Sequence, residues 1–189
     1  MKEVGRNVTI SDDISKQNIK VLREISAEVL GQHSTIRNVN WSEIPTAQEA
    51  SGYICATIPI CGKDIEVTFN TYFLPKETTG YVEAKNLNRE INNDFVIDFF
   101  KEYCNLIYGE YKRVFKHAGL SINQTLPESY IDNDHKFHTY AIESENHSIW
   151  QLTSTGGNLY VSLEFESIDK IAAQKLTKQE EPEEEICFL

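Results

Sequence analysis

The sequence lacks a long hydrophobic run, since no stretch approaches the roughly 20 apolar residues that a helix needs to span a membrane. The sequence also has few positively charged residues: it contains 18 Lys and Arg and 29 Asp and Glu, so the formal net charge is -11. This balance disfavours nucleic acids and anionic membranes as partners, because both would repel the chain at long range. A protein partner with a basic patch fits the charge better.

Cysteine is scarce, and no Cys-x-x-Cys spacing occurs. The four cysteines lie far apart: Cys55, Cys61, Cys104 and Cys187. The first seven residues have no apolar core, so a signal peptide is not expected. We therefore expect free thiols and a cytoplasmic protein, since disulfides persist mainly in oxidising compartments. A phosphate-binding loop, a nucleotide fingerprint and a catalytic-triad spacing are absent as well, and no metal site is expected.

What the chain does contain is the composition of one folded domain. Of its 189 residues, 40% are hydrophobic and 25% charged, enough for a single hydrophobic core. From Lys178 the sequence becomes Lys-Gln-Glu-Glu-Pro-Glu-Glu-Glu, which is too charged to fold on its own. We therefore predict a domain over residues 1–166 and an acidic, flexible tail over residues 167–189.

Hydrophobic periodicity predicts the order helix, strands, helix, strands. The first helix is expected to begin at residues 11–13 and to end near Gly31. The expected strands are residues 52–60, a second ending at Phe73, then 135–144, 148–154 and 159–166. The short turn at residues 62–64 predicts an antiparallel hairpin, and a loop at residues 78–80 precedes a short helix. This order predicts an α+β fold, with two long helices on one face of an antiparallel sheet.

The longest helical pattern runs from Asn92 to Gly119. Its apolar residues recur at steps of four and three: Val96, Phe100, Tyr103, Ile107, Tyr111, Val114 and Ala118. A polar stripe with the same stepping lies beside them: Asp98, Glu102, Asn105, Gly109 and Lys112. Glu102 and Asn105 are three residues apart, so a carboxylate and a carboxamide project from one face of the helix towards the same neighbour. This pair is the feature of the chain best suited to chemistry.

The first helix contains a weak echo of the long one. Residues 22–31 align with residues 100–109, so that Glu24 matches Glu102. Ala27 stands where the second helix has Asn105. The echo predicts an internal duplication, in which only the second copy carries the complete pair.

The residues around the pair form a longer motif: Glu102-x-x-Asn105-x-x-x-Gly109, then Gly119-Leu120 and Pro127. This motif resembles the signature segment of the CheC/CheX/FliY family of chemotaxis phosphatases, and the CheX branch most. The resemblance covers residues 10–166 in element order and residues 96–127 in motif detail. It implies a homodimeric CheX-like domain that hydrolyses the aspartyl phosphate of a CheY-like response regulator.

The resemblance also implies roles for single residues. Glu102 is expected to pair with the active-site lysine of the regulator, and Asn105 to orient the attacking water. The regulator is expected to supply the Mg2+, so the phosphatase needs no cofactor of its own. From their place on the polar stripe, Asp98, Gly109 and Lys112 are expected to contact the partner. The residues alone leave two other readings open: a non-catalytic module that docks a regulator or another signalling protein, and a phosphatase silent until a partner or the acidic tail engages it.

Overall fold

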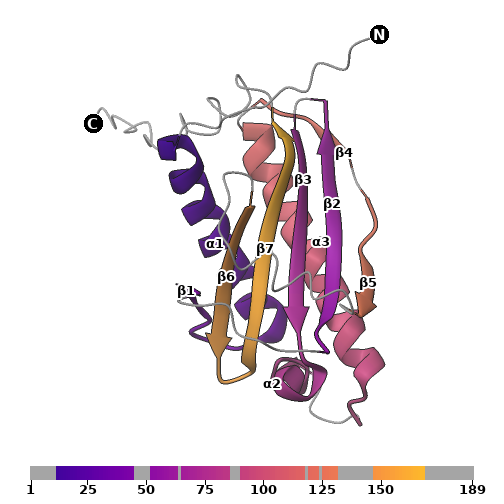
Figure 1. Cartoon of the computed structure of the whole chain (residues 1–189). Helices are drawn as coiled ribbons and strands as arrows, with labels where there is room; N and C mark the ends of the chain where they lie inside the picture. Colours follow the sequence, from indigo (N-terminus) through magenta and orange to yellow (C-terminus); the bar gives the residue numbers. More distant parts are fainter. Residues whose placement is uncertain are drawn as a thin grey trace, which may run out of the picture.

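The computed structural model describes residues 12–44, 52–63, 65–85, 90–117, 119–123, 125–131 and 147–168. Within these ranges the helices are α1 (Asp12–Ser34), α2 (Pro75–Lys85) and α3 (Asn93–His117). The strands are β1 (Asn40–Glu43), β2 (Ile54–Gly62), β3 (Ile65–Phe73), β4 (Ile122–Asn123), β5 (Glu128–Ile131), β6 (His147–Ser154) and β7 (Gly157–Ile168). The fold is α+β, as the sequence predicts (Figure 1).

The strands form one antiparallel sheet in the order β1-β6-β7-β3-β2-β4, and β5 pairs with β2. The predicted hairpin is confirmed: β2 and β3 pair from Ile54 opposite Phe73 to Cys61 opposite Glu66. A second hairpin joins β6 to β7. Alternation of side chains buries one row of each hairpin beneath the helices.

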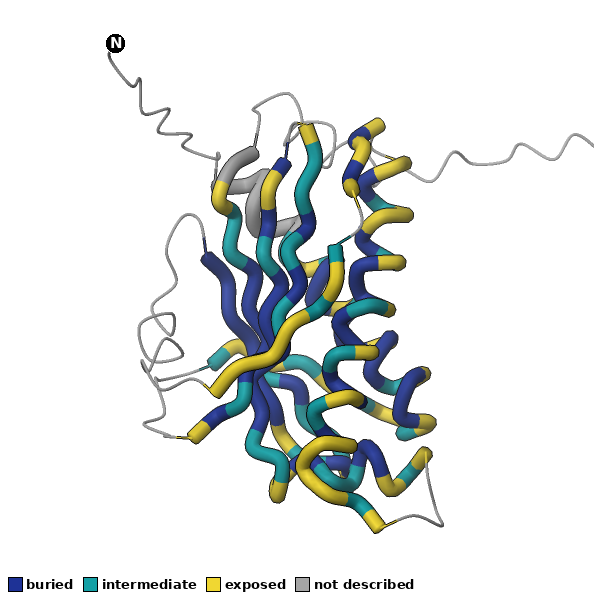
Figure 2. The backbone as a smooth tube through the Cα atoms, turned by 90° about the vertical axis from the view of Figure 1, so that its right-hand side faces the viewer, coloured by how far each residue is buried: buried dark blue, intermediate teal, exposed yellow. Residues whose placement is uncertain are grey.

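Three helices, one of them short, pack on this sheet, and α1 and α3 lie behind it in Figure 1. Two tyrosine hydroxyls of α3 donate hydrogen bonds to carbonyl oxygens of α1, Tyr103 to Ser26 at 2.9 Å and Tyr111 to Leu22 at 3.2 Å. These contacts make the two helices antiparallel. Buried residues gather where the helices meet the sheet, and exposed ones lie on the outward side of the helices (Figure 2).

Helix α1 ends at Ser34, three residues beyond the predicted end at Gly31. The Ser34 hydroxyl donates to the Leu30 carbonyl at 2.7 Å and accepts the Ile36 amide at 3.3 Å, which satisfies the end of the helix. A Cβ at Gly31 would lie 3.1 Å from the Ile36 carbonyl oxygen. Gly31 therefore serves a close approach of the backbone and does not terminate the helix.

The loop predicted at residues 78–80 is wrong, because these residues lie inside α2. Thr78 is buried and its hydroxyl donates to the Leu74 carbonyl at 3.0 Å. Gly80 faces the turn between β6 and β7, where a Cβ would come within 2.9 Å of Gly156. The glycine allows α2 to pack against this turn, and it does not mark a break in the helix.

A buried arginine joins α1 to the edge of the sheet. The Arg23 guanidinium donates to Glu43 and Ser148, each at 3.1 Å. It also lies over two indole rings, 5.2 Å from the centroid of Trp41 and 5.8 Å from that of Trp150. These contacts hold the short strand β1 against β6 and α1, and the sequence does not predict this strand.

Two further short strands, β4 and β5, follow α3 and pair with the outer edge of β2. The predicted strand over residues 135–144 lies outside the described residues, as does the greater part of the predicted tail. Within the described part, no disulfide involves Cys55, Cys61 or Cys104. None of the helices in the described part is long and apolar enough to cross a membrane.

Candidate functional site

Helix α3 carries the candidate site, and its ends are those that the sequence predicts. Its first turn is capped by Asn92, whose side-chain oxygen accepts the Phe95 amide at 3.0 Å. At its other end Gly119 has a φ of 73°, and the Leu120 amide reaches back to the Phe115 carbonyl at 2.8 Å. Burial of the apolar stripe fixes the direction of the polar stripe, and its fully buried members are Val96, Phe100, Tyr103, Ile107 and Tyr111.

The structure places all five predicted site residues on the solvent side of α3. Asp98, Glu102, Gly109 and Lys112 are exposed, and Asn105 is half-buried. Their roles stay predictions. Their common face follows from burial of the opposite side of the helix, where Phe100, Tyr103 and Ile107 are fully buried.

Glu102 and Asn105 contact each other. The Asn105 Nδ2 donates a hydrogen bond to the Glu102 Oε2 at 3.2 Å. This bond orients the carboxamide, since it turns the amide nitrogen towards the carboxylate and leaves Oδ1 as an acceptor for another group. The arrangement presents one carboxylate and one carbonyl oxygen side by side on the surface of the helix.

Gly109 and Lys112 extend this surface by about two turns. Outside the helix's own backbone, no atom of the described residues lies within 4 Å of the position that a Cβ on Gly109 would occupy. This glycine therefore does not serve packing against the described part of the domain. The Lys112 ammonium lies 5.8 Å from the centre of the Tyr108 ring. A flat stretch of backbone at Gly109 therefore lies between the pair and a positively charged side chain.

The Glu-x-x-Asn spacing of this pair does not recur among the residues of α1 that the structure describes. Glu24 is exposed like Glu102, but Ala27 is buried with 7% of its surface exposed. The internal duplication stays a prediction. Also within the described part of the chain, no three His, Cys, Asp or Glu side chains converge as a metal site would require.

A histidine and a lysine that sequence reasoning missed lie beside the pair. The buried imidazole of His33 in α1 stacks on Phe99, with ring centroids 4.2 Å apart. Its Nε2 lies 3.2 Å from the Phe99 carbonyl oxygen and its Nδ1 lies 3.1 Å from the Nζ of Lys85. Thr35 donates to the Ala84 carbonyl at 3.2 Å. These contacts join the ends of α1 and α2 next to α3. No local pattern in the sequence predicts this junction.

The imidazole of His33 is held neutral. Burial, and then the Lys85 ammonium, lower the pKa of His33 from 6.5 to about 4, against the opposing effects of the Phe99 carbonyl and the Glu102 carboxylate. A neutral ring donates from Nε2 to the carbonyl and accepts at Nδ1 from the ammonium. His33 is therefore a fixed acceptor that positions Lys85.

The lowered pKa of His33 predicts a loss of stability in acid. Between pH 6.5 and about pH 4 the unfolded chain binds the proton that the folded chain excludes, so the free energy of unfolding falls as the pH falls through this window. From pH 7 to pH 5 we expect this one group to account for about 2 kcal/mol. His33→Gln keeps a donor and an acceptor but does not titrate in this range. Between pH 7 and pH 5, its free energy of unfolding in urea denaturation should therefore fall by about 2 kcal/mol less than that of the wild type. Equal losses in the two proteins would contradict the assignment.

No protein-family model and no curated protein matches the sequence. Solved structures do match. CheX from Vibrio vulnificus has a TM-score of 0.59 and 16% identity, over 79% of this chain and 99% of that one. CheX in the CheX–CheY–BeF3–Mg2+ complex from Borrelia burgdorferi has a TM-score of 0.62 and 14% identity, over 78% and 97%. FliY from Thermotoga maritima has a TM-score of 0.59 and 10% identity, over 90% and 99%. The fold implied by the resemblance is confirmed.

Proposed function

We propose that the chain is a CheX-like phosphatase that hydrolyses the aspartyl phosphate of a CheY-type response regulator in the cytoplasm. The observation that carries this proposal is the Glu102–Asn105 pair, bonded together on the outward face of a helix in a CheX-like fold. The complex of CheX with CheY among the similar structures supports a CheY-type regulator as the partner.

Asn105 would orient the attacking water. An aspartyl phosphate is already reactive, and the regulator supplies its own Mg2+ and lysine, so the phosphatase has to place one water in line with the P–O bond. Because Nδ2 is directed at Glu102, Oδ1 is the atom that accepts a hydrogen from this water. A carboxamide also brings no negative charge towards the phosphoryl oxygens, which a carboxylate would repel.

Glu102 would dock the regulator. The bond to Asn105 uses Oε2 and leaves Oε1 to accept a charge-assisted hydrogen bond from the regulator's active-site lysine. Asp98 and Lys112 lie along the same face, before and after the pair. Charges of opposite sign at the two ends of this face favour one orientation of the partner.

The exposed backbone at Gly109 would allow the regulator to approach closely. We expect Gly109→Ala to raise the free energy of unfolding by up to about 1 kcal/mol, because the site is open and alanine is the better helix former. The same methyl group should weaken regulator binding about fivefold, since it lies in the contact surface. Chemical denaturation and titration with the beryllofluoride form of the regulator measure the two effects separately.

A gain in stability together with a loss of regulator affinity would show that Gly109 serves docking and not packing. If Gly109→Ala binds the regulator as tightly as the wild type, Gly109 does not belong to the docking surface.

The direct test of the proposed function is the decay of phosphorylated CheY-type regulators from the same organism, with and without this protein. Acceleration by catalytic amounts of the protein is the expected result. Absence of acceleration across all of the organism's CheY-type regulators would overturn the proposal.

The homodimer implied by the resemblance is part of the same proposal. All four residues of β5 are exposed at the outer edge of the sheet, with Ile131 60% exposed, and they would supply a pairing surface. A monomer in sedimentation equilibrium at micromolar concentration would contradict the proposed homodimer.

A further inference from the structure

A groove of about 320 Å³ lies where α1, α3 and the end of α2 meet. Thr35, just after α1, lines it together with residues of the three helices: Val29, Gln32, His33, Lys85, Leu106 and Glu110. This volume is near the lower end of the range of about 300–1,000 Å³ for small-molecule sites. The groove can therefore take a few side chains of a partner but not a large ligand.

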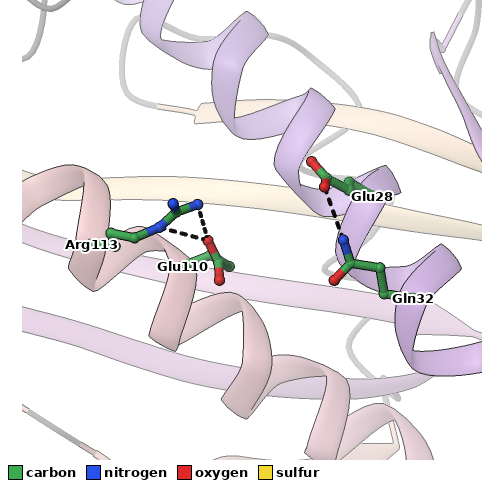
Figure 3. Close-up of polar contacts among 4 residues, drawn as sticks. All are labelled: Glu28, Gln32, Glu110 and Arg113. Carbon is green, nitrogen blue, oxygen red and sulfur yellow. Dashed lines mark hydrogen bonds and ion pairs between the residues drawn. The ribbon is translucent and has the colours of Figure 1, made fainter.

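Two polar residues of the lining, Gln32 and Glu110, each bond to a neighbour on their own helix. Figure 3 shows the two pairs, one on α1 and one on α3. On α1, Gln32 donates to Glu28 at 2.9 Å, and on α3 the Arg113 Nε donates to the Glu110 carboxylate at 3.0 Å. Because Glu110 pairs with Arg113, its charge is already neutralised on its own helix.

Lys85 is the positively charged residue of the groove that can bind a carboxylate of a partner. Within the described part of the chain its ammonium contacts the neutral ring of His33, and no carboxylate there forms an ion pair with it. A neutral acceptor fixes the position of Lys85 without cancelling its charge. The groove therefore combines one positioned positive charge with the apolar surface of Val29 and Leu106.

The groove is continuous with the proposed catalytic face. Leu106 lines it and follows Asn105 directly, one helical turn beyond Glu102. Its side chain is 39% exposed and lies outside the buried apolar stripe of α3. Glu102 is also close enough to His33 to affect its pKa. A regulator seated on the pair would therefore extend over the groove.

We infer that this groove is a second docking subsite for the regulator, which receives an apolar side chain against Leu106 and Val29 and a neighbouring carboxylate at Lys85. The inference rests on the proposed function, because it assigns the same partner to the groove. Glu102 and Lys85 then bind a lysine and a carboxylate of one regulator. Two charge pairs of opposite sense allow a single orientation and disfavour regulators without the acidic–apolar pair.

The test is a titration of the full chain with phosphorylated regulator, in which the dephosphorylation rate is followed as a function of regulator concentration. Lys85→Glu is expected to raise the regulator concentration at half-maximal rate about tenfold, and Leu106→Ser about fivefold, with the effect on the maximal rate much smaller. Lys116→Glu makes the same change of net charge on α3 outside the groove, and it should leave the titration unchanged. Thermal unfolding of each variant verifies the fold, and Leu106→Ser does not touch the contact between Lys85 and His33.

The possible outcomes separate this inference from the function on which it rests. If Lys85→Glu and Leu106→Ser titrate like Lys116→Glu while Asn105→Ala abolishes activity, the groove is not a subsite and the phosphatase stands. If the variants reduce the maximal rate and leave the half-maximal concentration unchanged, the docking role is also overturned. If the wild type neither binds nor dephosphorylates any CheY-type regulator of the organism, both proposals fall.

Discussion

Replacing Asn105 with alanine is expected to lower the rate of regulator dephosphorylation about 100-fold, because the attacking water loses the group that positions it. The fold should not change. Asn105 is half-buried on the outward face of α3, its bond is to the exposed Glu102, and alanine favours the helix. Release of phosphate from the phosphorylated regulator, followed with saturating phosphatase, measures this effect at the chemical step.

Asn93→Ala is the matched control for this experiment. It removes the same carboxamide from an exposed position at the start of α3, about two and a half turns before Glu102. Full activity of a folded Asn105→Ala protein would remove the proposed mechanism. Binding of the regulator without acceleration by the wild type would leave a docking module, in which Glu102 is a contact residue only.

Gly157→Ala is expected to lower the free energy of unfolding by about 4 kcal/mol, the largest loss of stability predicted here. Gly157 has a φ of 124°, where a side chain costs about 1–3 kcal/mol. A Cβ would also collide with the Glu77 carbonyl oxygen and lie 3.3 Å from the Cα of Thr78, so α2 would have to move. The hydrogen bond from the Tyr81 hydroxyl to the Gly157 carbonyl, 3.0 Å long, would be disturbed as well.

Gly119→Ala separates the cost of backbone strain from the cost of the collision with α2. Gly119 also has a positive φ, 73°, but apart from its chain neighbours no atom of the described residues lies within 4 Å of the position of its Cβ. Only backbone strain applies there, so a loss of about 1 kcal/mol is expected. Equal losses for Gly119→Ala and Gly157→Ala in urea denaturation would show that the contact with α2 contributes nothing. Because α2 ends at Lys85, a displaced α2 should also weaken regulator binding.

The elements that sequence reasoning predicts well are those whose signals are local. Helix α3 has a cap at Asn92, a positive-φ glycine at Gly119 and a regular apolar stripe between them, and all three act through residues close in the chain. The β2–β3 hairpin follows from alternation on both sides of a short turn. Glu102 and Asn105 share a face for the same reason, because helix geometry alone sets their spacing.

The secondary-structure predictions fail where contacts with a distant part of the chain determine the conformation of a residue. Gly80 predicts a break by local rules, yet it lies within α2 because the turn at Gly156 packs against it. The strand β1 has no strong pattern of its own, and contacts of Trp41 and Glu43 with Arg23 hold it in place. Local propensity is a small energy at such positions, and packing between elements exceeds it.

The sequence by itself determined the α+β class, the long helix α3 and the exposed pair on it, because periodicity decides which face of a helix is buried. Only the tertiary structure decided what lies beside that pair. It joined His33 of α1 to Lys85 of α2 against Phe99 of α3, and it opened the groove beside Leu106. These contacts depend on the packing of three separate helices on one sheet, and no spacing along the chain encodes that packing.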